Sequence, residues 1–177
     1  MAEIRTDQLL LPSVLDRLID HEPQTRQEAP RTRNQLLRDL KQAVRRDLEN
    51  LLNTRVRCVP FPPELTELKQ SLVNYGIPDL TGASLGSTRE REEFRRTIEA
   101  VIRLYEPRLR DDPRHKDDPR HKKLSVTILD HEAFDRTIRF HIEATLLAEP
   151  APEPVAFDSM LRLTTGTFEV KGESDGG

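Results

Sequence analysis

The sequence predicts an α+β fold in which N-terminal helices pack on a C-terminal antiparallel sheet of about three to four strands. Apolar residues recur with a helical period across residues 36–52 and 94–105. From residue 124 the apolar period changes to two, which is typical of half-buried strands. Helices followed by strands indicate an α+β arrangement with one core.

The composition indicates one domain with solvated tails. Hydrophobic residues make up 35% and charged residues 33% of the 177 positions, so the core must be modest and aliphatic. We expect a short helix and linker over residues 1–34 and an α+β domain over residues 35–171. A mobile loop is expected at 110–123 and a disordered tail at 172–177.

The first helix is predicted to begin at Pro12, because a missing amide is harmless at the first helical position. It is expected to need a partner surface for one apolar face, which comprises Val14, Leu15, Leu18 and Ile19. Residues 21–33 carry two prolines and few apolar side chains, which indicates a linker.

Two longer helices are predicted from capping boxes. Thr32 with Gln35 starts a helix that reaches Asn53, and Ser87 with Glu90 starts one that Pro107 ends. Oppositely charged pairs one turn apart support both helices: Arg45 with Glu49, Glu92 with Arg96, and Glu99 with Arg103. The charged face of the first of these helices, including Arg46, is expected to be solvated. Between them, Leu65, Leu68, Leu72 and Val73 predict a short helix, and residues 74–79 a specific turn.

The C-terminal part predicts strands over residues 124–128 and 138–146 and a third extended segment over 157–170, interrupted near Thr165 and Gly166. A Pro-rich stretch at 149–154 is expected to separate the second segment from the third. The duplicated DDPRHK sequence at 111–122 is expected to form a loop, and its histidines, His115 and His121, fix no metal-binding geometry.

Several function classes are disfavoured. Basic and acidic residues number 28 and 31 and are interspersed, so no strong positive field is available for nucleic acid. Cys58 is the single cysteine, which fits a reducing cytosol. We expect no cofactor and no direct membrane insertion, since the apolar run at residues 9–11 is too short for a signal peptide or a span.

No common catalytic motif is present, so a non-enzymatic role is favoured. Because a glycosidase needs only two carboxylates, with Glu49 or Glu106 as a candidate for one of them, a peptidoglycan-cleaving enzyme remains an alternative. His141, on the polar face of a predicted strand, is expected to have a surface role. The segment Glu106, Pro107 and Arg108 is either a helix stop with an ordinary ion pair or a rigid recognition corner.

Five segments, taken in order, resemble the TssE family of type VI secretion baseplate subunits, which is related to the wedge proteins of contractile phage tails. These segments are RRDLENLLN (45–53), SLVNYGIPDLTG (71–82), YEPRL (105–109), IRFHIEATL (138–146) and FDSMLRLTTGTF (157–168). The likeness covers residues 9–171, although the duplicated loop is longer than the family pattern leads us to expect.

The resemblance implies a structural role in which the corner locks the subunit into a wedge with TssF, TssG and TssK. It also implies that the terminal sheet offers an edge to arms of the sheath proteins TssB and TssC. The candidate partner-binding residues are Glu106, Pro107, Arg108, Tyr75 and Asp79. The implied location is the cytoplasm, docked at the inner membrane through the secretion complex. A cytoplasmic regulatory adaptor of the same fold remains a further alternative.

Overall fold

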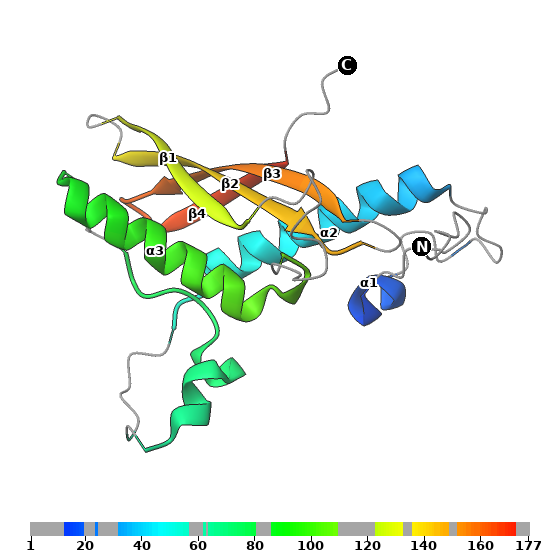
Figure 1. Cartoon of the computed structure of the whole chain (residues 1–177), viewed down its shortest axis with the longest axis horizontal. Helices are drawn as coiled ribbons and strands as arrows, with labels where there is room; N and C mark the ends of the chain where they lie inside the picture. The colour runs from blue at the N-terminus through cyan, green and yellow to red at the C-terminus, as the bar shows by residue number, and fades with distance from the viewer. Residues whose placement is uncertain are drawn as a thin grey trace.

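The computed structural model describes residues 13–19, 24, 32–56, 62, 64–80, 86–109, 123–132, 136–148 and 152–172. Helices come first and a four-stranded sheet comes last, so the α+β prediction is confirmed. Helices α2 and α3 lie on the same side of the sheet (Figure 1). Pro12, Cys58, the DDPRHK repeat and residues 173–177 lie outside the described residues.

Helix α2 (Arg33–Asn53) begins at Thr32, whose hydroxyl accepts from the Gln35 amide, while the Gln35 side chain accepts from the Thr32 amide. The predicted capping box is therefore confirmed. The stripe facing the sheet is most deeply buried toward the C-terminal end of the helix, at Val44, Leu48, Leu51 and Leu52. Burying such side chains stabilises the fold by about 1.5–3 kcal/mol each.

Helix α3 (Thr88–Tyr105) has the second predicted capping box, formed by Ser87 and Glu90. Phe94, Ile98 and Ile102 are buried against the sheet. The predicted pairs Glu92 with Arg96 and Glu99 with Arg103 are both formed. Local sequence rules thus describe this helix well.

The sheet contains β1 (Ser125–Glu132), β2 (Thr137–Leu146), β3 (Glu153–Arg162) and β4 (Thr167–Gly172), antiparallel in that order. The extended segment predicted over 157–170 is interrupted near Thr165 and Gly166, as expected, but the interruption is a reversal of the chain into two strands, because Gly166 adopts a φ of 65°. The expected separator at 149–154 is also too long. Pro154 lies in β3 opposite Thr145 of β2. It precedes Phe157, where the pairing of β3 with β4 begins, so its missing amide costs no hydrogen bond of the sheet.

The core lies between the helices and one face of the sheet. Phe140, at the centre of β2, makes edge-to-face ring contacts with Phe94 of α3 and Phe168 of β4, at centroid distances of 5.6 and 6.0 Å. Alternate residues of β2 point into this core, as the period of two predicted. One aromatic cluster therefore joins a helix to two strands.

The segment between α2 and α3 differs from the prediction. Two 3₁₀ turns, η1 (Thr66–Gln70) and η2 (Leu72–Asn74), replace the expected short helix, since Ser71 is extended. Leu65, Leu72 and Val73 are exposed, so no apolar face drives a longer helix. The predicted specific turn is confirmed at Gly76, where φ is 119° and a β-carbon would lie 2.4 Å from the Thr54 carbonyl oxygen.

Helix α1 (Val14–Leu18) exists, but its orientation was not foreseen. Val14, Leu15 and Leu18 are 73%, 58% and 76% exposed, so the apolar face points to solvent. The polar residue Asp16 faces the body of the molecule instead. A charge interaction, rather than apolar burial, attaches this helix.

Candidate functional site

The corner after α3 is built by the proline. Pro107 disfavours a helical conformation for the residue before it, and Glu106 accordingly leaves the helix with φ −113° and ψ 84°. The Glu106 amide still donates to the Ile102 carbonyl at 2.8 Å. The short 3₁₀ helix η3 (Pro107–Leu109) then buries Leu109. This places Glu106 and Arg108 on one rigid turn.

Glu106 and Arg108 form a closed ion pair. The Glu106 side chain accepts from Arg108 Nε at 2.7 Å and Nη2 at 2.6 Å, one bond to each carboxylate oxygen, and also from the Arg108 amide at 3.1 Å. Glu106 is only 4% exposed, so this is not an ordinary surface pair. These hydrogen bonds raise the pKa of Arg108 above its usual value, although burial opposes the shift.

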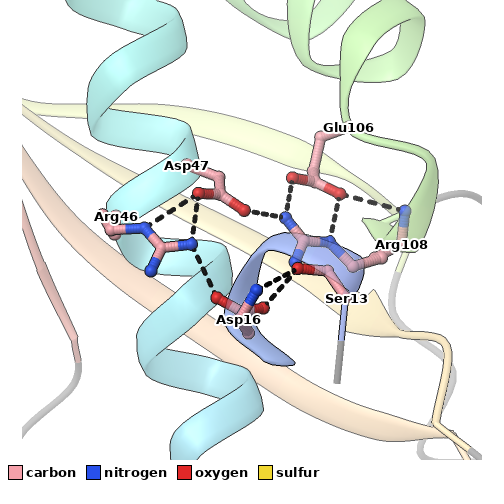
Figure 2. A network of polar contacts seen from close by, with 6 residues as sticks. All are labelled: Ser13, Asp16, Arg46, Asp47, Glu106 and Arg108. Atoms are coloured by element: carbon pink, nitrogen blue, oxygen red, sulfur yellow. Dashed lines mark hydrogen bonds and ion pairs between the residues drawn. The ribbon is translucent and has the colours of Figure 1, made fainter. Parts of the chain in front are cut away.

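Asp47 of α2 connects this pair to a larger cluster (Figure 2). Arg108 Nη2 donates to Asp47 Oδ2 at 2.6 Å. Arg46 donates to the other Asp47 oxygen at 2.9 and 3.1 Å, and it reaches Asp16 of α1 at 2.8 Å. We call Asp16, Arg46, Asp47, Glu106 and Arg108 the corner cluster. It ties α1, α2 and the end of α3 together.

Asp16 is held from both sides. The Ser13 hydroxyl donates to Asp16 Oδ2 at 2.6 Å and accepts from the Asp16 amide, which caps α1. Burial acts to raise the pKa of Asp16, but the hydrogen bonds from Ser13 and Arg46 outweigh burial and hold the pKa below its usual value. The carboxylate form therefore anchors α1 on α2.

Tyr75 lies beside the corner cluster. Its ring packs edge-to-face on Tyr105 with the centroids 5.2 Å apart, and the Tyr105 hydroxyl donates to the Ser71 carbonyl at 3.1 Å. Burial raises the pKa of Tyr75, and the negative charges of Asp47 and Glu106 raise it further. The turn at 74–79 is thereby fastened to the end of α3.

Asp79, the fifth candidate, makes its described ion pair elsewhere. It is 59% exposed, and its carboxylate lies 3.8 Å from Arg55 Nε. Arg55 also donates to the carbonyls of Leu52 and Gly166, at the junction of α2 with the turn before β4. The structure thus brings Glu106, Arg108 and Tyr75 together, with Pro107 exposed on the corner, and gives Asp79 a different partner.

Sequence reasoning missed three members of the corner cluster. Arg46 was assigned to a solvated face, and Asp16 and Asp47 were not singled out. The one signal for Asp47 is its place between the buried residues Val44 and Leu48, where a carboxylate is unusual. Its partner Arg108 lies 61 residues away, so no local spacing rule points to it.

The cluster is suited to holding structure rather than to reacting. Each carboxylate accepts from at least one arginine, and Glu49, the other carboxylate considered for catalysis, pairs with Arg45. Arg108 Nη1 is buried without an acceptor among the described residues. One donor of the cluster is therefore left unused.

Other candidate sites carry little chemistry. Within the described ranges no group of three His, Cys, Asp or Glu side chains is placed to hold a metal ion, and His115 and His121 lie outside them. His141 Nδ1 lies 2.7 Å from Asp158 Oδ1 on the polar sheet face, where it was predicted. Across the same ranges, none of the helices combines the length and apolarity needed to cross a membrane.

Comparison with known families gives a match over more than half of the chain. Residues 38–151 match the family described as baseplate wedge protein gp25. The matched range includes all five candidate residues and Asp47, and it ends just before β3. No curated protein and no solved structure matches the chain.

Proposed function

The chain belongs to the family of baseplate wedge protein gp25, and we propose that it is the TssE-type baseplate component of a type VI secretion system. Its family supplies structural components of phage-tail-like baseplates, which interact with other baseplate components. In this proposal the chain joins a wedge with TssF, TssG and TssK and seeds assembly of a sheath of TssB and TssC. It acts in the cytoplasm, docked at the inner membrane through the complex.

The corner cluster is the observation that carries the wedge role. Glu106 and Asp47 hold Arg108 by charge-assisted bonds, and Arg46 extends the cluster from Asp47 to Asp16 of α1. A subunit that transmits force needs a rigid contact surface. A turn fixed by proline and by bonds to both carboxylate oxygens of Glu106 supplies such a surface, with Pro107 exposed at its tip.

The open sheet supports the proposed role in sheath seeding. A sheet edge carries unpaired amides and carbonyls, and an extended arm of another protein can pair with them as an added strand. The described sheet is open rather than closed into a barrel, with β1 and β4 as its two edges. An arm that pairs with such an edge takes its orientation from the edge strand, so the edge would orient the first sheath ring.

A structural role is favoured over peptidoglycan cleavage. A glycosidase places two carboxyl groups on either side of a substrate cleft. The two buried glutamates of the described residues, Glu99 and Glu106, are engaged by arginines inside the fold instead. We therefore assign the chain no catalytic residue.

The test is a tagged pull-down of the chain from its own cells, with co-purifying proteins identified by mass. Wild type is expected to recover wedge and sheath proteins. Arg108→Lys keeps the charge but loses the planar two-point pairing, so it should recover wedge proteins about ten-fold less well. Glu106→Ala is a poorer probe because Glu106 is buried.

The matched control is Arg96→Lys, on an exposed position of α3 that pairs with Glu92. It should behave like wild type. Thermal melting of each variant separates loss of binding from loss of fold. If wild type recovers neither wedge nor sheath proteins, the proposed function is wrong.

A further inference from the structure

Helix α1 presents its apolar side chains to solvent and its polar side to the protein. Val14, Leu15 and Leu18 share one face of this five-residue helix, and all three are mostly exposed. They lie outside the buried apolar core. A surface helix ordinarily turns its apolar stripe toward the core, so this arrangement is reversed. The apolar face is therefore available to a partner.

Polar contacts hold α1 in this orientation. Asp16 points toward α2, where its Oδ1 accepts from Arg46 Nη2 at 2.8 Å (Figure 2). The Ser13 hydroxyl caps the helix and donates to Asp16 Oδ2 at 2.6 Å. A helix this short is unstable by itself in water, because fixing the first turn costs more than its few hydrogen bonds contribute. The contacts through Asp16 therefore orient an element that has too few internal bonds to persist without them.

The same contacts place α1 next to the corner after α3. Arg46 pairs with both Asp16 and Asp47. Asp47 in turn pairs with Arg108 at the corner. Pro107, exposed beside Arg108, is the tip of the corner that carries the proposed wedge role. The apolar face of α1 and the corner are thus fixed relative to each other, so one partner surface can contact both.

The charges around α1 favour a protein groove over a lipid surface. Residues 13–22 contain three acidic side chains, Asp16, Asp20 and Glu22, and one arginine, Arg17. A helix that lies on a membrane surface carries lysine or arginine on its polar face, which attracts anionic lipids. Anionic lipids would repel this acidic segment, whereas basic side chains at the rim of an apolar groove would complement it.

We propose that the apolar face of α1 docks into an apolar groove with a basic rim on a wedge protein, beside the corner. This inference rests on the proposed wedge role and adds a second contact surface to the corner. Val14, Leu15 and Leu18 supply the apolar area, as in other helices that bind in grooves. The contacts through Asp16 orient the helix before binding, so less conformational freedom is lost when the partner binds.

Leu18→Ala is the main test. Because Leu18 is 76% exposed and alanine favours the helix, the change should leave the stability of the free chain unaltered while it removes apolar area from the bound state. The tagged variant should recover wedge proteins about ten-fold less well, measured by quantitative mass spectrometry of the pull-down. Leu72→Ala is the matched control, since Leu72 of η2 is 80% exposed and lies outside α1. It should match wild type.

The outcomes separate this inference from the proposed function. If wild type and Leu18→Ala recover wedge proteins equally, the docking surface is wrong while the proposed function stands. An equal loss with Leu72→Ala would also overturn the assignment to α1. If wild type dimerises in sedimentation velocity and Leu18→Ala is monomeric with wedge recovery unchanged, α1 binds a second copy instead. Flotation of wild type with phosphatidylglycerol vesicles, lost in Leu18→Ala, would assign the face to lipid. If wild type itself recovers no wedge proteins, the proposed function fails.

Hydrogen exchange tests the orientation of α1. When wedge proteins bind, the amides of residues 14–19 should exchange at least ten-fold more slowly. Asp16→Asn weakens the pairing with Arg46 but keeps the apolar face, so wedge recovery should fall about three-fold, less than with Leu18→Ala. Unchanged exchange at residues 14–19 in the presence of bound wedge proteins would overturn the proposal.

Discussion

Glu99 on α3 and Glu106 at the residue that ends it are two buried carboxylates with different structural roles. Glu99 pairs with Arg95 and Arg103, one turn before and after it, and accepts from the Val126 amide of β1. Glu106 pairs with Arg108 on a turn, and Arg108 also pairs with Asp47 of α2. Glu99 closes a sheet edge with local partners, whereas Glu106 locks helices together through a distant one. Burial of a charged residue therefore does not by itself indicate a binding site.

The largest effect that separates them should come from Glu106→Ala. The change leaves Arg108 without the partner of its two-point pairing in a mostly buried position, so the free energy of unfolding should fall by about 3 kcal/mol. Urea denaturation followed by circular dichroism measures it. A loss below about 1 kcal/mol would mean that Asp47 alone compensates Arg108.

Glu99→Ala should cost less, about 2 kcal/mol. Its arginine partners are 33% and 41% exposed and can turn to water, so the main cost is an unsatisfied Val126 amide. Urea denaturation again gives the energy, and hydrogen exchange should show faster opening at Val126. An equal cost for both glutamates would contradict the distinction between local and distant partners.

Asp47→Asn tests the connection between α2 and the corner. Asparagine keeps one acceptor oxygen but loses the charge, so the free energy of unfolding should fall by about 1–2 kcal/mol. A double-mutant cycle with Glu106→Gln should show coupling, because both residues bind the same guanidinium. The same cycle between Asp47 and Glu99 should be additive.

The smallest effect is expected for Asp16→Asn. Only α1 depends on this side chain, so global stability should change by about 0.5 kcal/mol while exchange at residues 13–19 speeds up. Because the folded pKa of Asp16 lies below 3.8, its contribution is present above about pH 4 and is lost as pH falls further. Wild-type α1 should therefore fray only below about pH 4, while the asparagine variant shows no such step.

The parts of the fold that were predicted correctly rest on short-range rules. Both capping boxes and the i,i+4 pairs of α3 follow from residues at most four positions apart. The period of two in β2 reports burial on one sheet face directly. These features depend on local geometry, which can be read directly from the order of the residues.

The errors arise where a distant surface decides. The apolar stripe of α1 predicted inward packing, but no apolar burial compensates it and the Asp16–Arg46 pair sets its orientation instead. The break near Gly166 was expected, but its geometry was not: the reversal into a hairpin depends on the left-handed Gly166 and on the pairing of β3 with β4. At the candidate site, Glu106 and Arg108 were found from Pro107, while Asp47 depends on a tertiary contact that periodicity does not encode.

The contact between α2 and β4 also constrains how the chain folds during its synthesis. Arg45 reaches across 125 residues to Val170, and Asn53 across 115 to Phe168. Helix α2 emerges from the ribosome long before β4 is synthesised. The apolar stripe that ends at Leu51 and Leu52 is therefore exposed before the strand that packs against it exists. The nascent chain must keep this helix from other apolar surfaces, such as those of chaperones or neighbouring chains, until its last strand arrives. Completion of the core thus waits for the synthesis of β4.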